Sequence, residues 1–440
     1  MSALPRFGDF DRNHAVGHLW LAIWRISYKV APCDGVRGVA LGMAGPAITL
    51  DLRFRVVRPE QEIFIVFPGQ NYALYSYFVT NQRIFPELPG LDLLPKIRMA
   101  QQPDLDAKLL RARALNVWHS GGRKDDTRPS RQLSDYRNRR APKWLPQTRG
   151  VLMGFFDRAK KGDLVVVPPS SIFEKVLIGE LLDDNFEEAT LPELWERDAV
   201  PTRRVRWLAT PLRGECSVEL QRRFPSPNAV RILDREARGE IYSLAYGSYS
   251  IEDSFTSKFD VTSADFNTID DYRLQQLFNS IAALSELSET GQADAQKTVS
   301  KTTSWDDIIA FLTDPNYIPD LAVDISSPGT VILTCRKAVP FVAQALLALT
   351  ILGADVVWTA AQAQQITIQN TQAPPNDACT ADVAKEVLEQ LTMMGYARWQ
   401  LMCKQAEALR ASTGLKEQST VKQAPDVKAA TPVGQDKSKK

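Results

Sequence analysis

The middle third of the chain is divided into short apolar runs, and this pattern restricts the fold more than any other feature of the sequence. Residues 63–67 form a β-branched and aromatic run that Pro68 and Gly69 stop. Residues 164–167 form a second run between a Gly-Asp turn and two prolines. Runs of this length between turn residues are typical of buried strands. Further strands are expected at residues 176–182, 203–208 and 229–233, and helices at residues 104–117 and 217–224.

Several short strands joined by turns and one or two helices predict a small β-barrel rather than a doubly wound sheet. The length of 440 residues suits two or three domains, because single cores stop growing near ~250–300 residues. With 44% hydrophobic and 24% charged residues, the composition is that of a globular protein. We therefore expect the α+β class: a small β-barrel, a C-terminal α/β region and a disordered tail.

Three segments of the middle third resemble, in order, an EVE-like domain. This domain is a barrel of the PUA superfamily that is found in Mrr-type and related restriction and defence proteins. The segments are residues 161–169, 178–181 and 203–208. The resemblance covers residues 60–235 and implies a PUA/EVE-like barrel there. Thr202 stands where the family has a histidine, so no role of that histidine is carried over.

The resemblance implies nucleic-acid binding, in which a nucleotide, often with a modified base, is drawn out of its stack into a cleft. Such a site needs an aromatic slot for the base and cations for the flanking phosphates. The aromatic candidates, which lie at expected strand ends or loops, are Tyr72, Tyr75, Trp118 and Trp144. The cationic candidates flank Trp144 and are Arg139, Arg140 and Lys143. The identity of the base, its modification, and the choice of DNA or RNA stay open.

A basic stretch at residues 123–149 supports this interpretation. It holds nine basic and three acidic residues in a chain of net charge +1, and such a concentration suits phosphate contact. Its glycines and prolines predict a loop, and a merely solvated loop is the alternative. Trp207, on an alternating strand, is expected in the core. His119 is expected to be packed or at the surface rather than catalytic, because no nucleophile accompanies it.

Outside residues 60–235 we expect three further parts. Residues 1–59 are an N-terminal extension, and residues 413–440, which have no aromatic residue, are a disordered tail. Residues 236–412 are a C-terminal α/β or helical region that signals or binds a protein partner. In this region we expect two helices, at residues 269–287 and 381–412. We also expect a β–α–β unit, in which an apolar helix at residues 338–352 connects strands at 330–335 and 356–358.

No complete catalytic motif is found, so phosphate-loop, zinc-protease, hydrolase and base-deaminase chemistry lack support. Mrr-type nucleases hold Mg²⁺ with carboxylates and use a lysine to orient the attacking water. Asp324 and residues 331–337 match that pattern faintly, with Thr334 and Arg336 in the places of the second ligand and the lysine. We predict no cofactor and no metal. Five scattered cysteines and an N-terminus without a signal-like apolar run favour the cytoplasm.

These features predict a cytoplasmic nucleic-acid-recognition protein of the prokaryotic restriction or phage-defence type, and they favour a binding protein over an enzyme. One alternative is a restriction-type nuclease with a divergent metal site. Another is a membrane-perturbing effector that inserts residues 338–354. That segment is at the short end of the ~17–25 residues of a spanning helix and contains Pro340 and Gln344. A buried core helix is therefore our first expectation, and a membrane partner is not expected.

Overall fold

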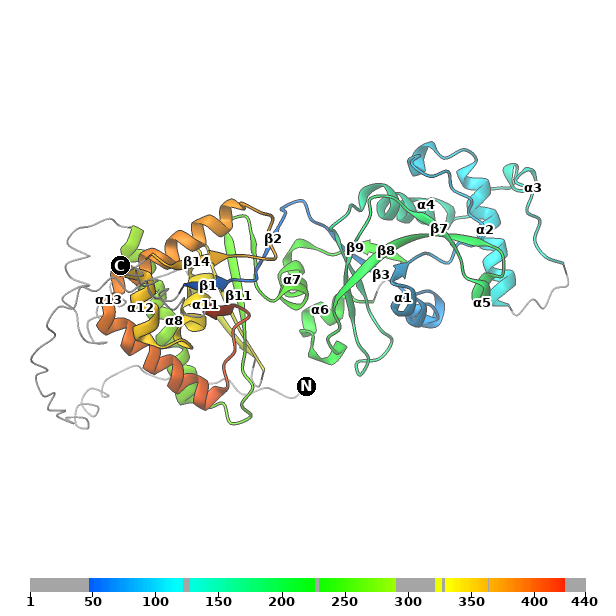
Figure 1. The fold of residues 1–440 in the computed structure, drawn as a ribbon. Helices are drawn as coiled ribbons and strands as arrows, with labels where there is room; N and C mark the ends of the chain where they lie inside the picture. Colours follow the sequence, from blue (N-terminus) through cyan, green and yellow to red (C-terminus); the bar gives the residue numbers. More distant parts are fainter. Residues whose placement is uncertain are drawn as a thin grey trace, which may run out of the picture. The chain divides into compact units, whose positions relative to one another are not determined.

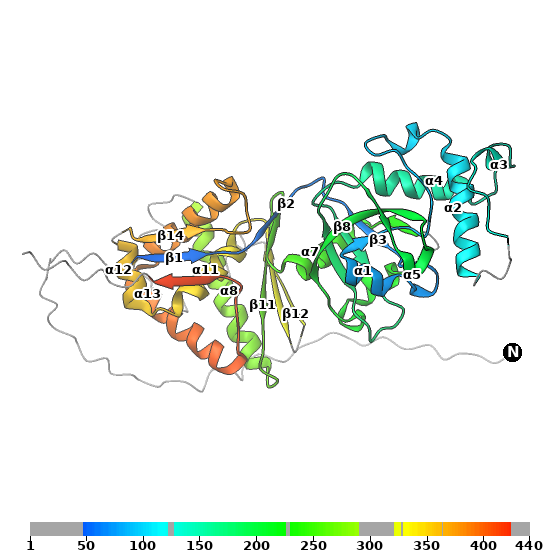
Figure 2. The ribbon, with the colours of Figure 1, turned by 45° about the vertical axis from the view of Figure 1, so that its right-hand side comes forward.

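The computed structural model describes residues 47–121, 127–225, 229–289, 321–326, 329–362 and 364–423, which form three sheets and the helices packed on them (Figure 1, Figure 2). The structure is mixed α+β, as the sequence predicts. Its largest sheet is a curled half-barrel with the strand order β4-β8-β6-β5-β3-β9, and β7 pairs with β8. The strands are β3 (Ile63–Val66), β4 (Arg83–Ile84), β5 (Leu164–Val167), β6 (Leu177–Leu181), β7 (Glu187–Thr190), β8 (Ala199–Ala209) and β9 (Val230–Ile232).

The expected strands of the middle third are confirmed, but the small barrel is only half formed. Strand β3 pairs with β5 in parallel, and the other pairings of this sheet are antiparallel. Strands β4 and β9 lie at the two ends of the strand order, and within the described residues no pairing joins them. The sheet therefore keeps two open edges.

Helices cover both faces of the half-barrel, which explains why its strands β3 and β5 are continuous apolar runs rather than alternating ones. On β3, Phe64 and Val66 belong to one core, and Ile63 and Ile65 belong to another core on the opposite face. The first core also contains residues of α1 (Tyr75–Asn81), α2 (Leu105–Ser120), α4 (Leu145–Leu152) and α5 (Pro192–Trp195). The second contains residues of α6 (Val218–Arg223) and α7 (Arg238–Tyr246).

Gly179 allows a close contact between two neighbouring strands of this sheet. The register of β6 against β8 shifts between Ile178 and Gly179. A Cβ atom at Gly179 would lie 2.3 Å from Val205 Cγ1 and 2.7 Å from Trp207 Cε3, so the Trp207 ring lies directly on the β6 backbone. Trp207 is half-buried and packs against the first core; the sequence predicts a core position for it.

Arg203 ties β8 to the segment that precedes β5. Its side chain is fully buried, and its Nη1 donates to the carbonyls of Phe155 and Ala159 at 3.0 Å each. Its Nη2 donates to the carbonyl of Asp183. A buried cation is stable only when hydrogen bonds replace its water, and here three main-chain oxygens do so.

The segment predicted as a loop at residues 123–149 contains two helices, so that prediction is wrong in part. Helix α3 is short (Ser134–Arg137), and α4 begins at Leu145. Pro146 lies in the first turn of α4, where its missing N–H has no intrahelical partner to lose. Residues 122–126, with Arg123 and Lys124, lie outside the described residues.

The other two sheets combine strands from both ends of the chain. The five-stranded sheet has the order β12-β13-β11-β10-β2, and the three-stranded sheet has the order β14-β1-β15. Their strands are β1 (Ile48–Asp51), β2 (Arg55–Val57), β10 (Tyr249–Ile251), β11 (Ser254–Asp260), β12 (Leu321–Ser326), β13 (Thr330–Cys335), β14 (Ile366–Gln369) and β15 (Thr420–Gln423). Strand β15 lies inside the predicted disordered tail, which is a correction, because antiparallel pairing with β1 orders residues 420–423.

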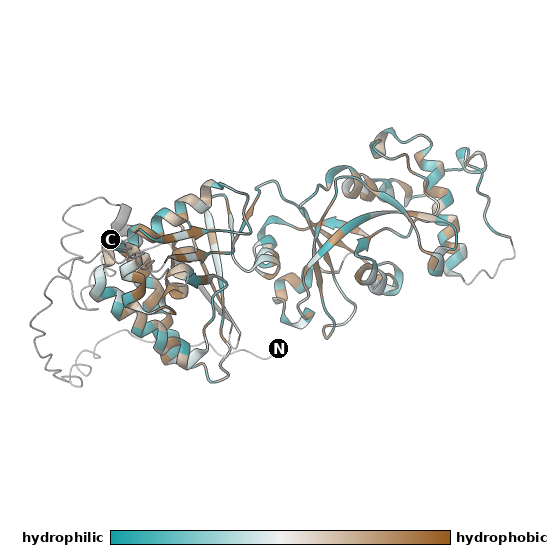
Figure 3. Cartoon of the chain, in the orientation of Figure 1, coloured by the Kyte–Doolittle hydropathy of each residue, from teal (hydrophilic) through white to brown (hydrophobic). Residues whose placement is uncertain are grey.

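The helices of the C-terminal region are α8 (Thr268–Glu289), α11 (Val339–Thr350), α12 (Ala354–Gln362) and α13 (Ala378–Thr413). Three of them confirm expected helices, but α12 replaces the strand predicted at residues 356–358. An apolar run of three residues suits either a strand or one turn of a helix, and Val357 and Ala360 are buried at helical spacing. Helix α13 carries hydrophobic and hydrophilic bands in Figure 3, as expected for an amphipathic helix.

Helix α11 is the centre of the C-terminal core, because every one of its residues is buried. It is the core helix that we expected first for residues 338–354. In the described part of the chain no single helix is long and apolar enough to cross a membrane. Helices α11 and α12 reach that length only as a pair bent by 115°.

Candidate nucleic-acid interface

Four arginines of the basic stretch are held in ion pairs within the half-barrel region. Arg137 donates to Asp104 through Nε at 3.1 Å and Nη2 at 2.6 Å, and Arg149 pairs with Asp106. Arg128 and Arg131 both bind the carboxylate of Asp198, just before β8. These contacts fasten the stretch to α2 and to the start of β8, so the charges of these four arginines are compensated within the protein.

Arg139, Arg140 and Lys143 are the exceptions. All three side chains are exposed, and none pairs with a carboxylate among residues 47–121, 127–225 and the other described segments. The Arg139 guanidinium lies 4.4 Å from the ring centroid of Tyr136, and its Nε donates to the Asp135 carbonyl at 2.9 Å. The three cations proposed from the sequence are therefore those whose charge remains available to a ligand.

Trp144 lies directly beside these cations, at the N-cap of α4. Its ring is half-buried and packs against the first core of the half-barrel. The guanidinium of Arg113, on α2, lies 5.2 Å from the ring centroid. We call Arg113, Arg139, Arg140, Lys143 and Trp144 the 139–144 surface. Arg113 was missed in the sequence because nothing in the local pattern pairs a residue of α2 with the start of α4.

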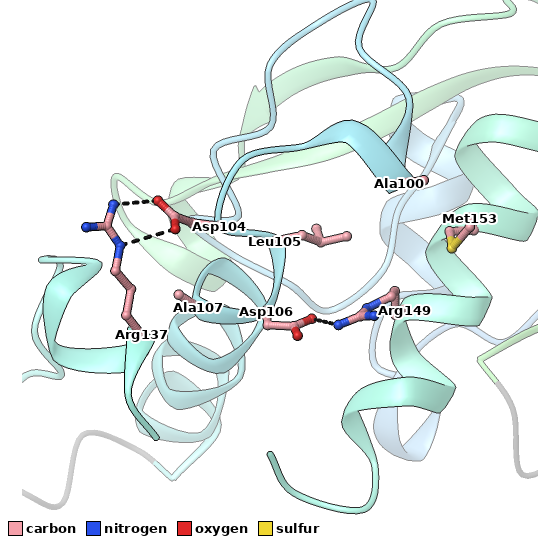
Figure 4. Close-up of a pocket in the computed structure, with 8 residues that line it drawn as sticks. All are labelled: Ala100, Asp104, Leu105, Asp106, Ala107, Arg137, Arg149 and Met153. Atoms are coloured by element: carbon pink, nitrogen blue, oxygen red, sulfur yellow. Dashed lines mark hydrogen bonds and ion pairs between the residues drawn. The ribbon is translucent and has the colours of Figure 1, made fainter. Parts of the chain in front are cut away.

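Figure 4 shows two of the ion pairs, whose arginines precede and follow residues 139–144 in the sequence. Asp104 and Asp106, at the start of α2, point to Arg137 and Arg149 on either side of a pocket of about 430 Å³. The hydrogen bond from Arg137 holds the pKa of Asp104 below its usual range. Because each arginine faces a carboxylate, the pocket carries little net charge, and its ion pairs fasten the segment that contains residues 139–144 to α2.

Trp118 belongs to a different, mostly buried cluster. It lies in the last turn of α2, where the Arg128 guanidinium is 5.2 Å from its ring centroid. The next residue, His119, is 2% exposed at its side chain, and its Nε2 lies 3.1 Å from Oδ2 of Asp198. The histidine is thus packed, in line with the sequence interpretation. This cluster anchors residues 128–131 to the body of the half-barrel.

Tyr72 and Tyr75 lie in a third place, on a short 3₁₀ turn and at the start of α1. The Tyr75 hydroxyl donates to the Lys175 carbonyl at 2.5 Å, and burial raises the pKa of this phenol. Neither tyrosine contacts Trp118 or Trp144 in any described interaction. Tyr75 and Trp118 lie on helices, not at the strand ends or loops that the sequence predicts for them.

Two residues of the faint nuclease pattern lie on the neighbouring strands β12 and β13. Asp324 on β12 stands opposite Ile332 on β13, and the Thr334 hydroxyl lies 3.2 Å from that of Thr256 on β11. Across the residues that the structure describes, no group of three or more His, Cys, Asp or Glu side chains is placed to hold a metal ion.

Comparison with known proteins returned no match: no protein-family model, no curated protein and no solved structure is similar to this chain. The resemblance to EVE-like domains therefore depends on its three sequence segments alone.

Proposed function

We propose that the protein binds nucleic acid through the 139–144 surface. The observation that supports this proposal is the contrast within one basic stretch: four of its arginines have carboxylate partners, and three neighbouring cations have none among the residues that the structure describes. Cations grouped without counter-charges repel one another, and a polyanion relieves that repulsion. Arginine and lysine at phosphates supply most of the affinity of such interfaces.

Trp144 gives the proposed surface a stacking group. A half-exposed indole that is fixed by its helix and by the Arg113 cation–π contact loses little conformational freedom when a base stacks on it. Stacking tolerates any base, so this surface suits a single strand or an extruded nucleotide better than the groove of a regular duplex.

The EVE-like resemblance extends the proposal to a modified base and to a cytoplasmic restriction or phage-defence protein. In that interpretation the half-barrel corresponds to the PUA/EVE-like barrel and reads one nucleotide, while the C-terminal region transmits the signal or binds a partner. The finding on metal ligands gives no support to the nuclease alternative.

The test is the salt dependence of binding to single-stranded and double-stranded DNA and RNA oligonucleotides, measured by fluorescence anisotropy. The triple variant Arg139→Gln, Arg140→Gln, Lys143→Gln is expected to lower the slope of log K against log salt by about two to three. The matched control is Lys404→Gln, Lys416→Gln, Lys422→Gln, which removes three exposed charges of the C-terminal region. Equal slopes for the triple variant, the control and the wild type would reject the proposal.

A further inference from the structure

A second group of cations surrounds a pocket beside the turn that precedes β5. The pocket has a volume of about 710 Å³. The cationic side chains that line it are Arg55, Arg58, Lys160, Lys161 and Arg206, and the acidic ones are Glu180 and Asp184. We call it the Gly162 pocket, after the glycine of the turn. It shares no residue with the 139–144 surface.

Glu180 forms ion pairs with two of the arginines, Arg55 and Arg206. Its side chain is 7% exposed, and its carboxylate accepts from Arg55 Nη2 at 2.6 Å and from Arg206 Nη2 at 2.5 Å. One buried negative charge therefore holds two guanidinium groups, which leaves one positive charge uncompensated. The Arg206 side chain is still 59% exposed, so its remaining donors face solvent.

Arg55 is fixed from a second side. Its guanidinium lies 5.6 Å from the ring centroid of Tyr246. Burial raises the pKa of Tyr246 to about 12, so this phenol stays neutral at physiological pH and does not offset the charge of Arg55.

The turn places the two lysines next to this pair of arginines. Gly162 has φ +88°, and Arg58 Nη2 donates to the Lys161 carbonyl at 3.0 Å. The backbone N–H groups of Lys160 and Lys161 donate to Asp163 and Asp184 at 2.8 and 2.7 Å. The backbone of the turn is thus held by hydrogen bonds. The exposed lysine ammonium groups have no carboxylate partner in the described part of the chain.

We infer that the Gly162 pocket binds a phosphate group, carried either by a free nucleotide or by a nucleic-acid strand. Five cations against two carboxylates leave a net positive charge, and arginines that are fixed in advance are suited to the several oxygens of a phosphate. Lysines add mobile point charges at the rim of the site. This inference does not depend on the 139–144 surface.

Isothermal titration of the full-length protein tests it, with orthophosphate, ATP, and single-stranded oligonucleotides with and without a 5′-phosphate. The double variant Lys160→Gln, Lys161→Gln is expected to weaken binding about tenfold, since two cationic partners of the phosphate are lost. Arg206→Gln is a second variant, which leaves Glu180 paired with Arg55. The matched control is Lys404→Gln, Lys416→Gln, and thermal melts verify that each variant is folded.

The outcomes separate the two sources of phosphate. Tighter binding of ATP than of both oligonucleotides identifies a nucleotide site. A preference for the 5′-phosphorylated strand over its unphosphorylated form identifies a nucleic-acid end. If none of the probes binds, or if the pocket variants bind like the control, the inference is overturned. The variant at residues 139, 140 and 143 is expected to bind orthophosphate like the wild type, so a failure of the proposed function is recognised separately.

Discussion

The half-barrel and the two C-terminal sheets differ in the origin of their strands. The half-barrel takes all its strands from one continuous segment, from β3 to β9. The C-terminal sheets take β1 and β2 from the start of the described chain and pair them with β14, β15 and β10. Because of this difference, we expect the half-barrel to fold more independently than the C-terminal sheets.

The largest expected effect concerns the C-terminal region without its N-terminal strands. A fragment of residues 236–423 loses two strands and the core residues Ile48, Leu50 and Phe54, whose ring stacks on Phe341 at 4.0 Å between centroids. We expect it to show no cooperative unfolding by circular dichroism, and to regain a transition when a peptide of residues 47–57 is added. A cooperative unfolding transition in the fragment alone would show that the C-terminal region folds without β1 and β2.

The second prediction tests how much the buried Arg203 side chain stabilises the half-barrel. Arg203→Met removes the buried cation and leaves three carbonyl acceptors without their donor, so the free energy of unfolding should fall by about 3–5 kcal/mol. The neighbouring Arg204→Met is the control, because Arg204 is exposed and pairs with Asp183 at the surface; this variant should leave the free energy of unfolding nearly unchanged. Urea unfolding measures both variants, and equal losses would mean that Arg203 does not hold the half-barrel together.

The third prediction sharpens the boundary between the two regions. The sequence places it at residue 235, but Ile241 and Tyr242 of α7 pack in the second core of the half-barrel. A fragment of residues 60–247 should therefore be more stable than one of residues 60–235 by about 3 kcal/mol, the value for burying two large side chains. Thermal melts of the two fragments measure this difference in stability. Equal melting temperatures would show that α7 does not stabilise the half-barrel and belongs to the C-terminal region.

The smallest effect separates packing from binding within the half-barrel. Trp207→Ala opens a void above Gly179 and should cost about 2–3 kcal/mol of stability, since the ring is only half-buried. Trp144→Ala should cost about 1 kcal/mol of stability, and it should weaken oligonucleotide binding by about 1–3 kcal/mol. Melting curves measure the stability of the two variants, and fluorescence anisotropy measures their affinity for oligonucleotides. If Trp144→Ala destabilises the protein as much as Trp207→Ala and leaves affinity unchanged, Trp144 is only a packing residue.

The sequence predicts β3 and β5 well because both of their faces are buried, which makes each of them an uninterrupted apolar run. The short strands β4 and β7 are not apolar runs, and the sequence does not predict them. It does not predict the partners of these strands. The pairing of β1 with β14 and β15 depends on residues at opposite ends of the chain, and no local pattern encodes it. At residues 356–358 the run was too short to distinguish a helix from a strand.

The candidate site was predictable to a similar extent. Charge and spacing led to Arg139, Arg140, Lys143 and Trp144, which are neighbours in the sequence, so no long-range contact is needed to group them. The cations of the Gly162 pocket were not found, because Arg55, Lys160 and Arg206 come from three distant segments and only the fold brings them together. Tyr75 lies on α1 and Trp118 lies on α2, so the fold, rather than a local pattern, decides where each of these aromatic side chains lies.

The pairing of β1 with β15 also has a consequence for synthesis on the ribosome. Ile48 pairs with Gln423, and at ~5–20 residues per second its partner is made roughly 20–75 s later. The half-barrel is complete well before then. Until β14 and then β15 are made, Ile48 and Leu50, which are fully buried in the finished protein, remain on a strand without a partner strand, as a segment that a chaperone can recognise.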